Sequence, residues 1–229
     1  MNDPYIQENG VLKNKLNILD YTELKQAEKD ITFAKFLNIS DFFSTSCNSD
    51  CLKAIHKHIF SDVFDWAGEY RTIQMYKPED VLDGMSLQFS EPEDINQKID
   101  DCVSKLNSVD WDSLSLSEKS STFTNLLLEL WKIHPFRDGN TRTTLTFAYH
   151  FSNEHNFPID LSMLLNRLTR TPDENGVNHS IRDKFVLSNY FYSSKIQLAN
   201  IFQDAMLSGI NNKISTLQRN LRDDKDLSI

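Results

Sequence analysis

The sequence predicts an all-α fold, a bundle of helices that carries one small β-hairpin. Apolar residues recur at the three- and four-residue spacing of a helix through most of the chain. A period of two, which is typical of strands, is confined to residues 70–90. Glycine and proline are scarce: the 229 residues include six of each, against a usual combined share of roughly 12%. A fold with many tight turns is therefore not expected.

The first 40 residues are predicted to form an irregular arm followed by a helix over residues 21–36. One face of that helix is apolar and consists of Leu24, Ala27, Ile31 and Ala34. A second amphipathic helix is predicted over residues 51–66, and Gly68 is expected to end it.

Two short runs with a period of two, residues 70–76 and 86–90, predict the β-hairpin. In the first run Ile73 and Met75 alternate with polar residues. Because an isolated hairpin is only marginally stable in water, it must pack against helices. Its outer edge would stay unpaired, and such an edge can accept an extended segment of another protein by strand addition.

Helical spacing resumes at residue 91 and continues to about residue 106. The most apolar helix is predicted over residues 121–133. It should end before Pro135, because the residue before a proline disfavours the α conformation. A further helix is predicted over residues 141–153, after the pair Gly139 and Asn140.

The C-terminal part, residues 158–221, predicts two or three more helices, interrupted near residues 172–176. We expect three regions along the chain. The arm and first helix occupy residues 1–40, the main domain residues 41–205, and a C-terminal helix with a frayed tail residues 206–229.

Composition restricts the possible binding partners and the cellular compartment. A net charge of −9 and the lack of a basic cluster argue against nucleic-acid binding. The first residues lack a signal-peptide pattern and no apolar run reaches about 18 residues, so no membrane association is expected. Three cysteines without a paired CxxC predict free thiols in a reducing cytoplasm. The glycines lie too far apart for a glycine-rich phosphate loop.

The residues that can carry chemistry are concentrated in the run HPFRDGNTR, residues 134–142. A helix that begins after Gly139 presents free N–H groups and a positive dipole end to an anion. Arg142 can bind phosphate oxygens through two parallel hydrogen bonds, and Asp138 is a hard oxygen ligand suited to Mg²⁺. His134 can remove a proton from an attacking hydroxyl. A helix end, a turn and a surface ion pair would use the same residues, so spacing alone leaves both interpretations open.

This run resembles the signature of the Fic (filamentation induced by cAMP) family, HxFx(D/E)GNGRxxR. The matching positions are His134, Phe136, Asp138, Gly139, Asn140 and Arg142. Residues 52–72 are similar to the family's helix that leads into a flap hairpin, and the start of the chain is similar to its N-terminal arm. The resemblance covers roughly residues 3–200 and implies the Fic fold, an all-α core with a hairpin flap.

The resemblance further implies a protein adenylyltransferase, which transfers AMP from ATP to a hydroxyl of a target protein. His134 would be the general base and Asp138 the Mg²⁺ ligand. The nucleotide would be bound by Gly139, Asn140, Thr141 and Arg142, with the first two around the α-phosphate and Arg142 on the β-phosphate side. Phe136 would anchor the loop. The target would dock on the flap residues Thr72, Ile73, Gln74 and Met75.

Two positions depart from the family signature. Thr141 replaces its second glycine, and a β-branched residue there would be strained if its φ were positive. Leu145 replaces its second arginine. Because residues 142 and 145 are expected to share a helix face, the γ-phosphate loses a binding group. The (S/T)xxxE(G/N) motif of autoinhibited members is also missing, so we expect no intramolecular glutamate of that type. A separate antitoxin-like partner has weak support.

Other functions remain open. The same site could transfer a phosphoryl group or use another nucleotide, or the chain could be a catalytically weak module that holds a partner strand on the flap edge. His56 is predicted to be a hydrogen-bonded core residue. His150 and His155 are not spaced as a pair of metal ligands on one helix face. Three aromatic residues are predicted to lie mainly in the core, where one could stack on a base: Tyr190, Phe191 and Tyr192.

Overall fold

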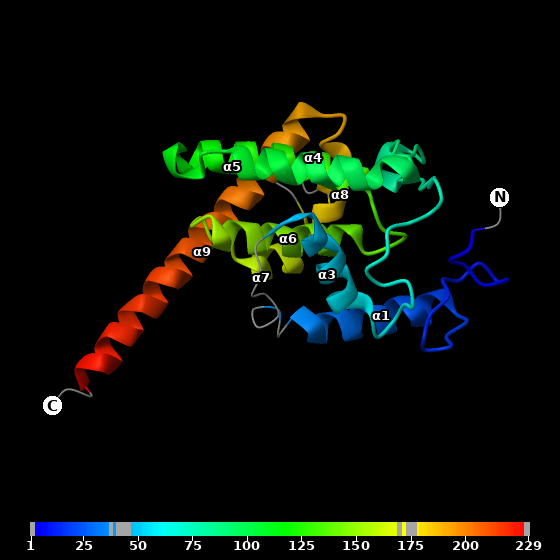
Figure 1. Cartoon of the computed structure of the whole chain (residues 1–229), viewed down its shortest axis with the longest axis horizontal. Coiled ribbons are helices and arrows are strands. Elements are labelled where there is room, and N and C mark those ends of the chain that lie inside the picture. Colours follow the sequence, from blue (N-terminus) through cyan, green and yellow to red (C-terminus); the bar gives the residue numbers. More distant parts are fainter. Residues whose placement is uncertain (1–2, 37–38, 40–46, 169–170, 173–177, 227–229) are drawn as a thin grey trace.

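The computed structural model describes residues 3–36, 39, 47–168, 171–172 and 178–226. The described part is mostly helical, which confirms the predicted all-α class (Figure 1). Its helices are α1 (Tyr21–Phe36), α3 (Ser49–Phe60), α4 (Ile95–Ser108), α5 (Leu116–Ile133), α6 (Asn140–Glu154), α7 (Leu161–Asn166), α8 (Ile181–Leu187) and α9 (Tyr192–Asp226). Single 3-10 turns occur at Asp80–Leu82, Pro92–Asp94 and Trp111–Ser113.

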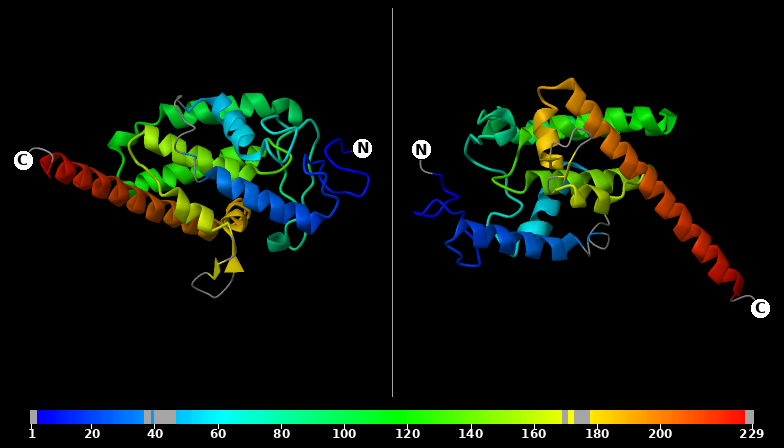
Figure 2. Two further views of the ribbon diagram at one scale, coloured as in Figure 1. Left: turned by 90° about the horizontal axis from the view of Figure 1, so that it is seen from below. Right: turned by 180° about the vertical axis from the view of Figure 1, so that it is seen from behind.

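Helix α6 lies near the centre of the bundle, with α3 on one side and α5 on another (Figure 1). Helix α5 also packs against α4 and α9, and α1 packs on the outer side of α3. The two further views show α9 crossing the bundle and leaving it, with the C-terminal end far from the N-terminal arm (Figure 2). The arm, α1, α3 and α8 each place residues beside the loop between α5 and α6.

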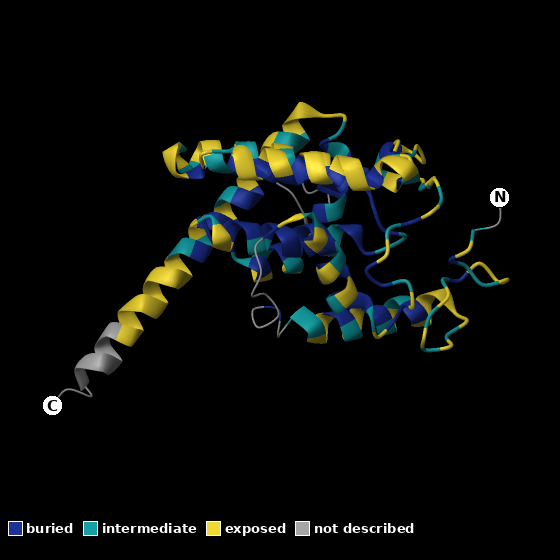
Figure 3. Ribbon diagram, in the orientation of Figure 1, coloured by how far each residue is buried: buried dark blue, intermediate teal, exposed yellow. Residues whose placement is uncertain are grey.

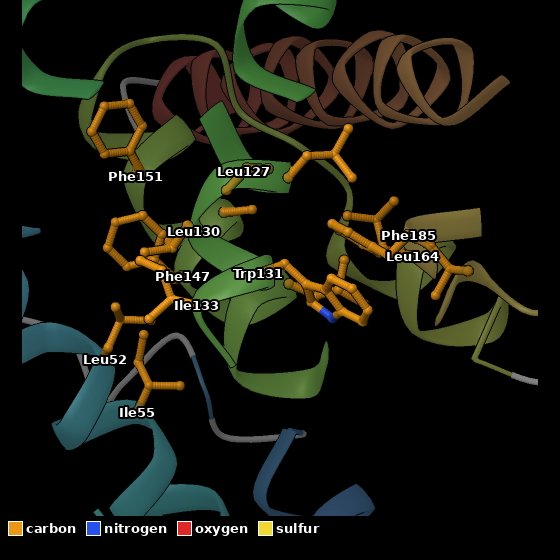
Figure 4. Packing of buried hydrophobic residues seen from close by; sticks show 14 of the residues in the cluster. Leu52, Ile55, Leu127, Leu130, Trp131, Ile133, Phe147, Phe151, Leu164 and Phe185 are labelled. Carbon is orange, nitrogen blue, oxygen red and sulfur yellow. The ribbon is translucent and has the colours of Figure 1, made fainter. Parts of the chain in front are cut away.

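The core fills the space between α5, α6 and their neighbours (Figure 4). Trp131 of α5 stacks on Phe185 of α8 with ring centroids 5.3 Å apart. Phe123, Phe151 and Phe202 form a second buried aromatic group. Burying a large apolar side chain stabilises the fold by about 1.5–3 kcal/mol, and these residues fix the two helices that flank the α5–α6 loop.

Two helix boundaries differ from the predicted ones by five residues or more. Helix α3 ends at Phe60, and residues 61–66 form turns instead of continuing the helix to residue 66. The arm causes part of this difference, because Lys15 N–H donates to the carbonyl of Val63 at 2.8 Å. Helix α5 begins at Leu116, five residues before the predicted start. Ser115 and Glu118 form a capping box there, a signal that the apolar spacing alone did not reveal.

The predicted hairpin strands at residues 70–76 and 86–90 do not form a regular ladder. Only Pro78 and Ser86 make an antiparallel bridge. The backbone is held by side chains instead: Arg71 Nη1 donates to the carbonyl of Ile73 at 2.6 Å, and Gln74 Nε2 donates to that of Phe89 at 3.3 Å. The inward and outward alternation survives, because residues 73, 75, 77 and 79 are more buried than the residues between them. We keep the name flap for residues 70–90.

The described strands lie elsewhere. Thr171–Pro172 (β1) pairs antiparallel with Asn178–His179 (β2). Much of the predicted interruption at residues 172–176 lies outside the described residues.

Helix α9 is continuous from Tyr192 to Asp226 and so passes through residue 205, where we expected the main domain to end. Residues 211–220 are all exposed (Figure 3). The tail expected to be frayed is DDKDLSI, residues 223–229; α9 includes residues 223–226, and residues 227–229 lie outside the described part. None of the described helices combines the length and the apolar character that crossing a membrane requires.

The prediction that the aromatic run before α9 belongs mainly to the core is wrong. Tyr190, Phe191 and Tyr192 are 54%, 52% and 78% exposed. They lie at the short connection between α8 and α9. Because most of this connection is not helical, helical spacing does not indicate which of its side chains face the bundle.

Candidate active site

The loop between α5 and α6 is shaped by two residues in the left-handed region. His134 ends α5 with φ 54°, and Gly139 precedes α6 with φ 79°. Gly139 has a second requirement, because a Cβ there would lie 2.4 Å from Cζ of Phe60 in α3. Glycine is therefore needed both for the backbone conformation and for the close approach of α3.

Asn140 and His56 hold the loop from inside. The Asn140 side chain accepts from the Phe136 N–H at 2.9 Å and donates to the Phe136 carbonyl at 2.8 Å. His56 lies 3.1 Å from the Asp138 carbonyl through Nε2, accepts from the Gly68 N–H at 2.9 Å, and stacks on Phe136 with centroids 3.9 Å apart. The prediction of a hydrogen-bonded core histidine is confirmed. Both groups of the Asn140 side-chain amide bind the loop, and the Asn140 backbone N–H, at the first position of α6, has no acceptor among the described residues.

His134 is 3% exposed, and its ring stacks on Phe89 of the flap at 4.0 Å. Its Nδ1 is buried and makes no hydrogen bond with any described residue. Burial, followed by the positive charges of Lys77 and Arg182, holds the pKa of His134 well below its ordinary value of 6.5. The imidazole is therefore neutral at physiological pH, the state that a general base requires.

Arg71 connects the flap to this histidine. It is 2% exposed, and its Nε donates to the His134 carbonyl at 2.8 Å. The same guanidinium donates to the carbonyls of Ile73 and Ser90, and the Arg71 N–H donates to the Pro135 carbonyl at 2.8 Å. One side chain thus fixes the flap relative to the α5–α6 loop.

Asp138 faces a lysine from α1. Lys25 Nζ lies 2.6 Å from Asp138 Oδ2, and Asp138 Oδ1 accepts from the Gly139 N–H at 2.7 Å. Burial would raise the pKa of Asp138, but the charges of Lys25 and Lys77 outweigh it and hold that pKa well below its ordinary range. The carboxylate is therefore ionised and placed to hold a cation.

Arg142 is also engaged by α1. Its guanidinium forms an ion pair with Glu28, donates to Thr32 Oγ1 at 3.0 Å and lies over the Phe60 ring at 4.6 Å. Glu28 is only 1% exposed and also pairs with Lys25 at 3.0 Å. The sequence lacks the family's autoinhibitory motif, yet a glutamate from another position of the chain binds the arginine of the signature.

The two positions that depart from the signature have different consequences. Thr141 lies in the first turn of α6 and is not among the residues with positive φ, so no strain arises. Its Oγ1 accepts from the Trp131 indole N–H at 3.0 Å. Leu145 is fully buried in the core and does not line the cavity described next. The side chain at position 145 therefore brings no charge to the cavity.

The residues predicted for catalysis, nucleotide binding and metal binding converge on one cavity of about 410 Å³. It is lined by the whole predicted group: His134, Asp138, Gly139, Asn140, Thr141 and Arg142. The arm closes one side with Ile6, Gly10 and Leu12, and α1 adds Tyr21 and Lys25. A larger hollow of about 780 Å³ lies between α1, α7 and α9, but its lining is mainly apolar and lacks His134 and Asp138. The smaller cavity is therefore the candidate active site, because it holds the residues that can carry out a reaction.

The four predicted docking residues lie outside this lining, in the flap. The Thr72 N–H donates to Tyr5 Oη at 3.1 Å, and the Met75 N–H donates to Gln74 Oε1 at 2.8 Å. Within the described part of the chain, the backbone N–H groups of Ile73 and Gln74 have no acceptor. Such groups are available to a strand added along the flap.

Sequence reasoning missed several residues that line the cavity or position its groups: Lys25, Glu28, Arg71, Lys77 and Arg182. Most lie far from the signature in the chain, and no local spacing connects them to it. A detectable signal existed for two of them, because Arg71 and Lys77 occupy inward positions of the alternating flap segment, where apolar residues are expected.

Comparison with known proteins agrees with this geometry. Residues 46–152 match the profile of the Fic/DOC family. This matched segment, somewhat less than half of the chain, is a Fic domain. The protein adenylyltransferase VbhT of Bartonella schoenbuchensis is 29% identical over 161 residues, which are 69% of this chain and 32% of VbhT. The chain therefore spans about a third of the length of that relative. The probable protein adenylyltransferase y4lH of Sinorhizobium fredii is 29% identical over 172 residues and is covered to 77% of its length.

Solved structures share the fold of this Fic domain. The N-terminal FIC domain of Bep8 from Bartonella sp. 1-1C has a TM-score of 0.69 and 20% identity, over 88% of this chain and 94% of that one. BepC from Bartonella tribocorum, solved with bound AMPPNP, has a TM-score of 0.68 and 19% identity, over 88% and 95% of the two chains.

Proposed function

We propose that the protein transfers AMP from ATP to a hydroxyl side chain of a target protein. One observation carries the proposal: a neutral, buried His134 lies in the same cavity as an ionised Asp138 and the N-terminal turn of α6. The names of two relatives, the protein adenylyltransferase VbhT and the probable protein adenylyltransferase y4lH, support the same reaction.

The nucleotide phosphates would bind at the start of α6. The backbone N–H groups of residues 140–142 have no partner inside the helix and point along its positive dipole end. Gly139 keeps this approach open, the Thr141 hydroxyl stands beside it, and Arg142 adds a guanidinium. BepC, a structural neighbour solved with bound AMPPNP, supports a nucleotide as the ligand.

His134 would act on the target hydroxyl. The hydroxyl oxygen forms a bond to the α-phosphorus of ATP, the bond from that phosphorus to the β-phosphate oxygen breaks, and pyrophosphate leaves. The hydroxyl proton goes to the neutral imidazole. Arg71 and Phe89 keep the ring in place through the backbone carbonyl and the stacked face.

The donor set of the cavity fits Mg²⁺ in the form in which proteins usually bind it with nucleotides. Mg²⁺ is commonly held by one or two carboxylates together with substrate phosphates. Asp138 is ionised and its Oδ2 already faces a cationic group, the Lys25 ammonium. No group of three potential metal ligands occurs among the described residues, so Asp138 and the phosphates would share the metal. Bound Mg²⁺ would neutralise phosphate charge during the transfer.

The flap would present the target. Its free N–H groups at Ile73 and Gln74 can pair with an extended segment. Because Arg71 ties the flap to His134, a segment paired there would be held in a fixed position relative to the base.

The test uses ATP labelled at either the α- or the γ-phosphate, with Mg²⁺ and a lysate that contains candidate targets. The wild type should transfer the α-label and not the γ-label. His134→Ala should abolish transfer, while His155→Ala, a histidine stacked on Phe151 outside the cavity, should retain it. Absence of α-label transfer by the wild type would contradict the proposal.

Phosphoryl transfer from the same cavity is the second candidate. It is favoured by the burial of Leu145, because the charge expected there is missing and the triphosphate could bind in another orientation. Transfer of the γ-label in the same experiment would select this reaction.

A further inference from the structure

The charges around the cavity are almost all paired. Five basic side chains line it: Lys25, Lys77, Arg137, Arg142 and Arg182. Four of them meet carboxylates, in the ion pairs Lys25 with Asp138, Arg137 with Asp3, Arg142 with Glu28 and Arg182 with Glu79. The side chain of Lys77 makes no ion pair or hydrogen bond with any residue in the described ranges. Of the five basic side chains, Lys77 is the one without a direct carboxylate partner in the part of the chain that the structure describes.

The fold holds the Lys77 backbone in place. The Lys77 N–H donates to Ser86 Oγ at 3.0 Å, and the next residue, Pro78, forms the antiparallel bridge to Ser86. Glu79, only 3% exposed, then ties the flap to α8 through its ion pair with Arg182. Lys77 therefore cannot leave the cavity by a simple shift of the flap backbone.

Lys77 also faces inward by the pattern of the flap. Residues 73, 75, 77 and 79 form the more buried side of the segment, and the half-buried Lys77 lines the cavity. Burial accordingly lowers the pKa of Lys77. The Lys77 ammonium pairs directly with no carboxylate among the described residues, and Asp138 and Glu79 act on it only by longer-range attraction, so an anion bound in the cavity would stabilise it.

We propose that Lys77 binds the phosphate chain of the nucleotide from the flap side and supplies the second positive charge that Leu145 does not provide. This inference rests on the proposed function, because it assumes that a nucleotide occupies the cavity. The signature contributes only Arg142, and Glu28 already engages that guanidinium. Lys77 lines the same cavity as His134 and the α6 turn, so phosphates bound at that turn face it.

The test measures binding by isothermal titration calorimetry, with ATP, inorganic tripolyphosphate and adenosine as probes. Lys77→Met should weaken binding of ATP and tripolyphosphate by about ten- to a hundredfold, the effect of losing one charge-assisted contact. Adenosine binding should not change. Lys77→Arg should restore most of the affinity, because a guanidinium also binds phosphate.

Lys29→Met is the matched control, since Lys29 is exposed on α1 and does not line the cavity. It removes the same charge from the protein and should leave all three affinities unchanged. Circular dichroism and thermal unfolding of each variant report the fold separately.

Three outcomes would overturn the inference: equal ATP affinity in the wild type and Lys77→Met, an equal loss of adenosine binding, or no ATP binding by the wild type. The proposed function fails on a different readout. Tight binding through Lys77 without transfer of label would leave this inference standing and remove the transferase. Transfer of label by Lys77→Met with an unchanged KM for ATP would leave the transferase standing and remove this inference.

Discussion

Lys25 Nζ lies 2.6 Å from Asp138 Oδ2, although 112 residues separate the two along the chain. The pair joins α1 to the loop between α5 and α6. Burial alone would lower the pKa of Lys25, but the charges of Asp138 and Glu28 outweigh it and raise that pKa above its ordinary value. A protonated ammonium thus occupies the side of Asp138 that a metal ion would need.

Replacing Lys25 should therefore strengthen Mg²⁺ binding at Asp138. In Lys25→Met the carboxylate loses a competing cation, and the Mg²⁺ concentration needed for half-maximal ATP binding should fall, on the order of tenfold. Titration of Mg²⁺ at fixed ATP measures this concentration. Lys29→Met, on the exposed side of the same helix, should behave as the wild type. A higher Mg²⁺ requirement in Lys25→Met would show that Lys25 supports the site instead of competing with the metal.

Glu28 should limit nucleotide affinity in a similar way. It is a buried carboxylate bound to Arg142, the arginine that we expect to hold phosphate. Glu28→Gln removes the competing charge while keeping the shape, so ATP should bind about tenfold more tightly. Calorimetry measures the change, and Glu23→Gln, exposed on the same helix, is the control. Unchanged or weaker ATP binding would mean that Glu28 orients Arg142 for the nucleotide.

Gly139 should be the least replaceable of the cavity residues. Gly139→Ala places a Cβ 2.4 Å from the Phe60 ring in addition to imposing a positive φ. We expect a loss of unfolding free energy of about 3 kcal/mol or more, since overpacking adds about 1–3 kcal/mol to the cost of the left-handed conformation. Gly84→Ala has a similar φ of 84° with no atom within 4 Å, and should lose only about 1–2 kcal/mol. Urea denaturation of both variants separates the two contributions, and equal losses would refute the steric one.

The buried histidines should make stability fall in mild acid. Burial lowers the pKa of His56 to about 3, whereas the unfolded chain binds that proton near pH 6.5. Between these values the unfolded state binds more protons, so the free energy of unfolding decreases as the pH falls. The slope contributed by one such histidine is about 1.4 kcal/mol per pH unit.

Urea denaturation between pH 4 and 6 tests this dependence. His56→Gln should be less stable than the wild type at pH 7, because it loses contacts to Gly68 and Asp138, but its stability should fall less steeply with acid. Parallel slopes for the two proteins would contradict a neutral native His56.

Much of the fold could be predicted because helices are encoded by local spacing. The apolar positions of residues 121–133 and the proline at 135 located the end of α5, and Gly139 located the start of α6. Boundaries that depend on contacts with distant segments were less predictable. Helix α3 ends early where the arm binds Val63, and the flap strands lose their ladder because Arg71 and Gln74 take the backbone carbonyls.

The sequence by itself determined the nine-residue signature and the family to which this domain belongs, because the loop between two adjacent helices is built from consecutive residues. Only the tertiary structure decided which charged side chains surround that loop. Lys25, Glu28, Lys77 and Arg182 reach it from α1, the flap and α8. Their placement follows from the packing of whole helices, which brings together side chains separated by up to about half of the chain, and electrostatic interactions depend on those distances in space.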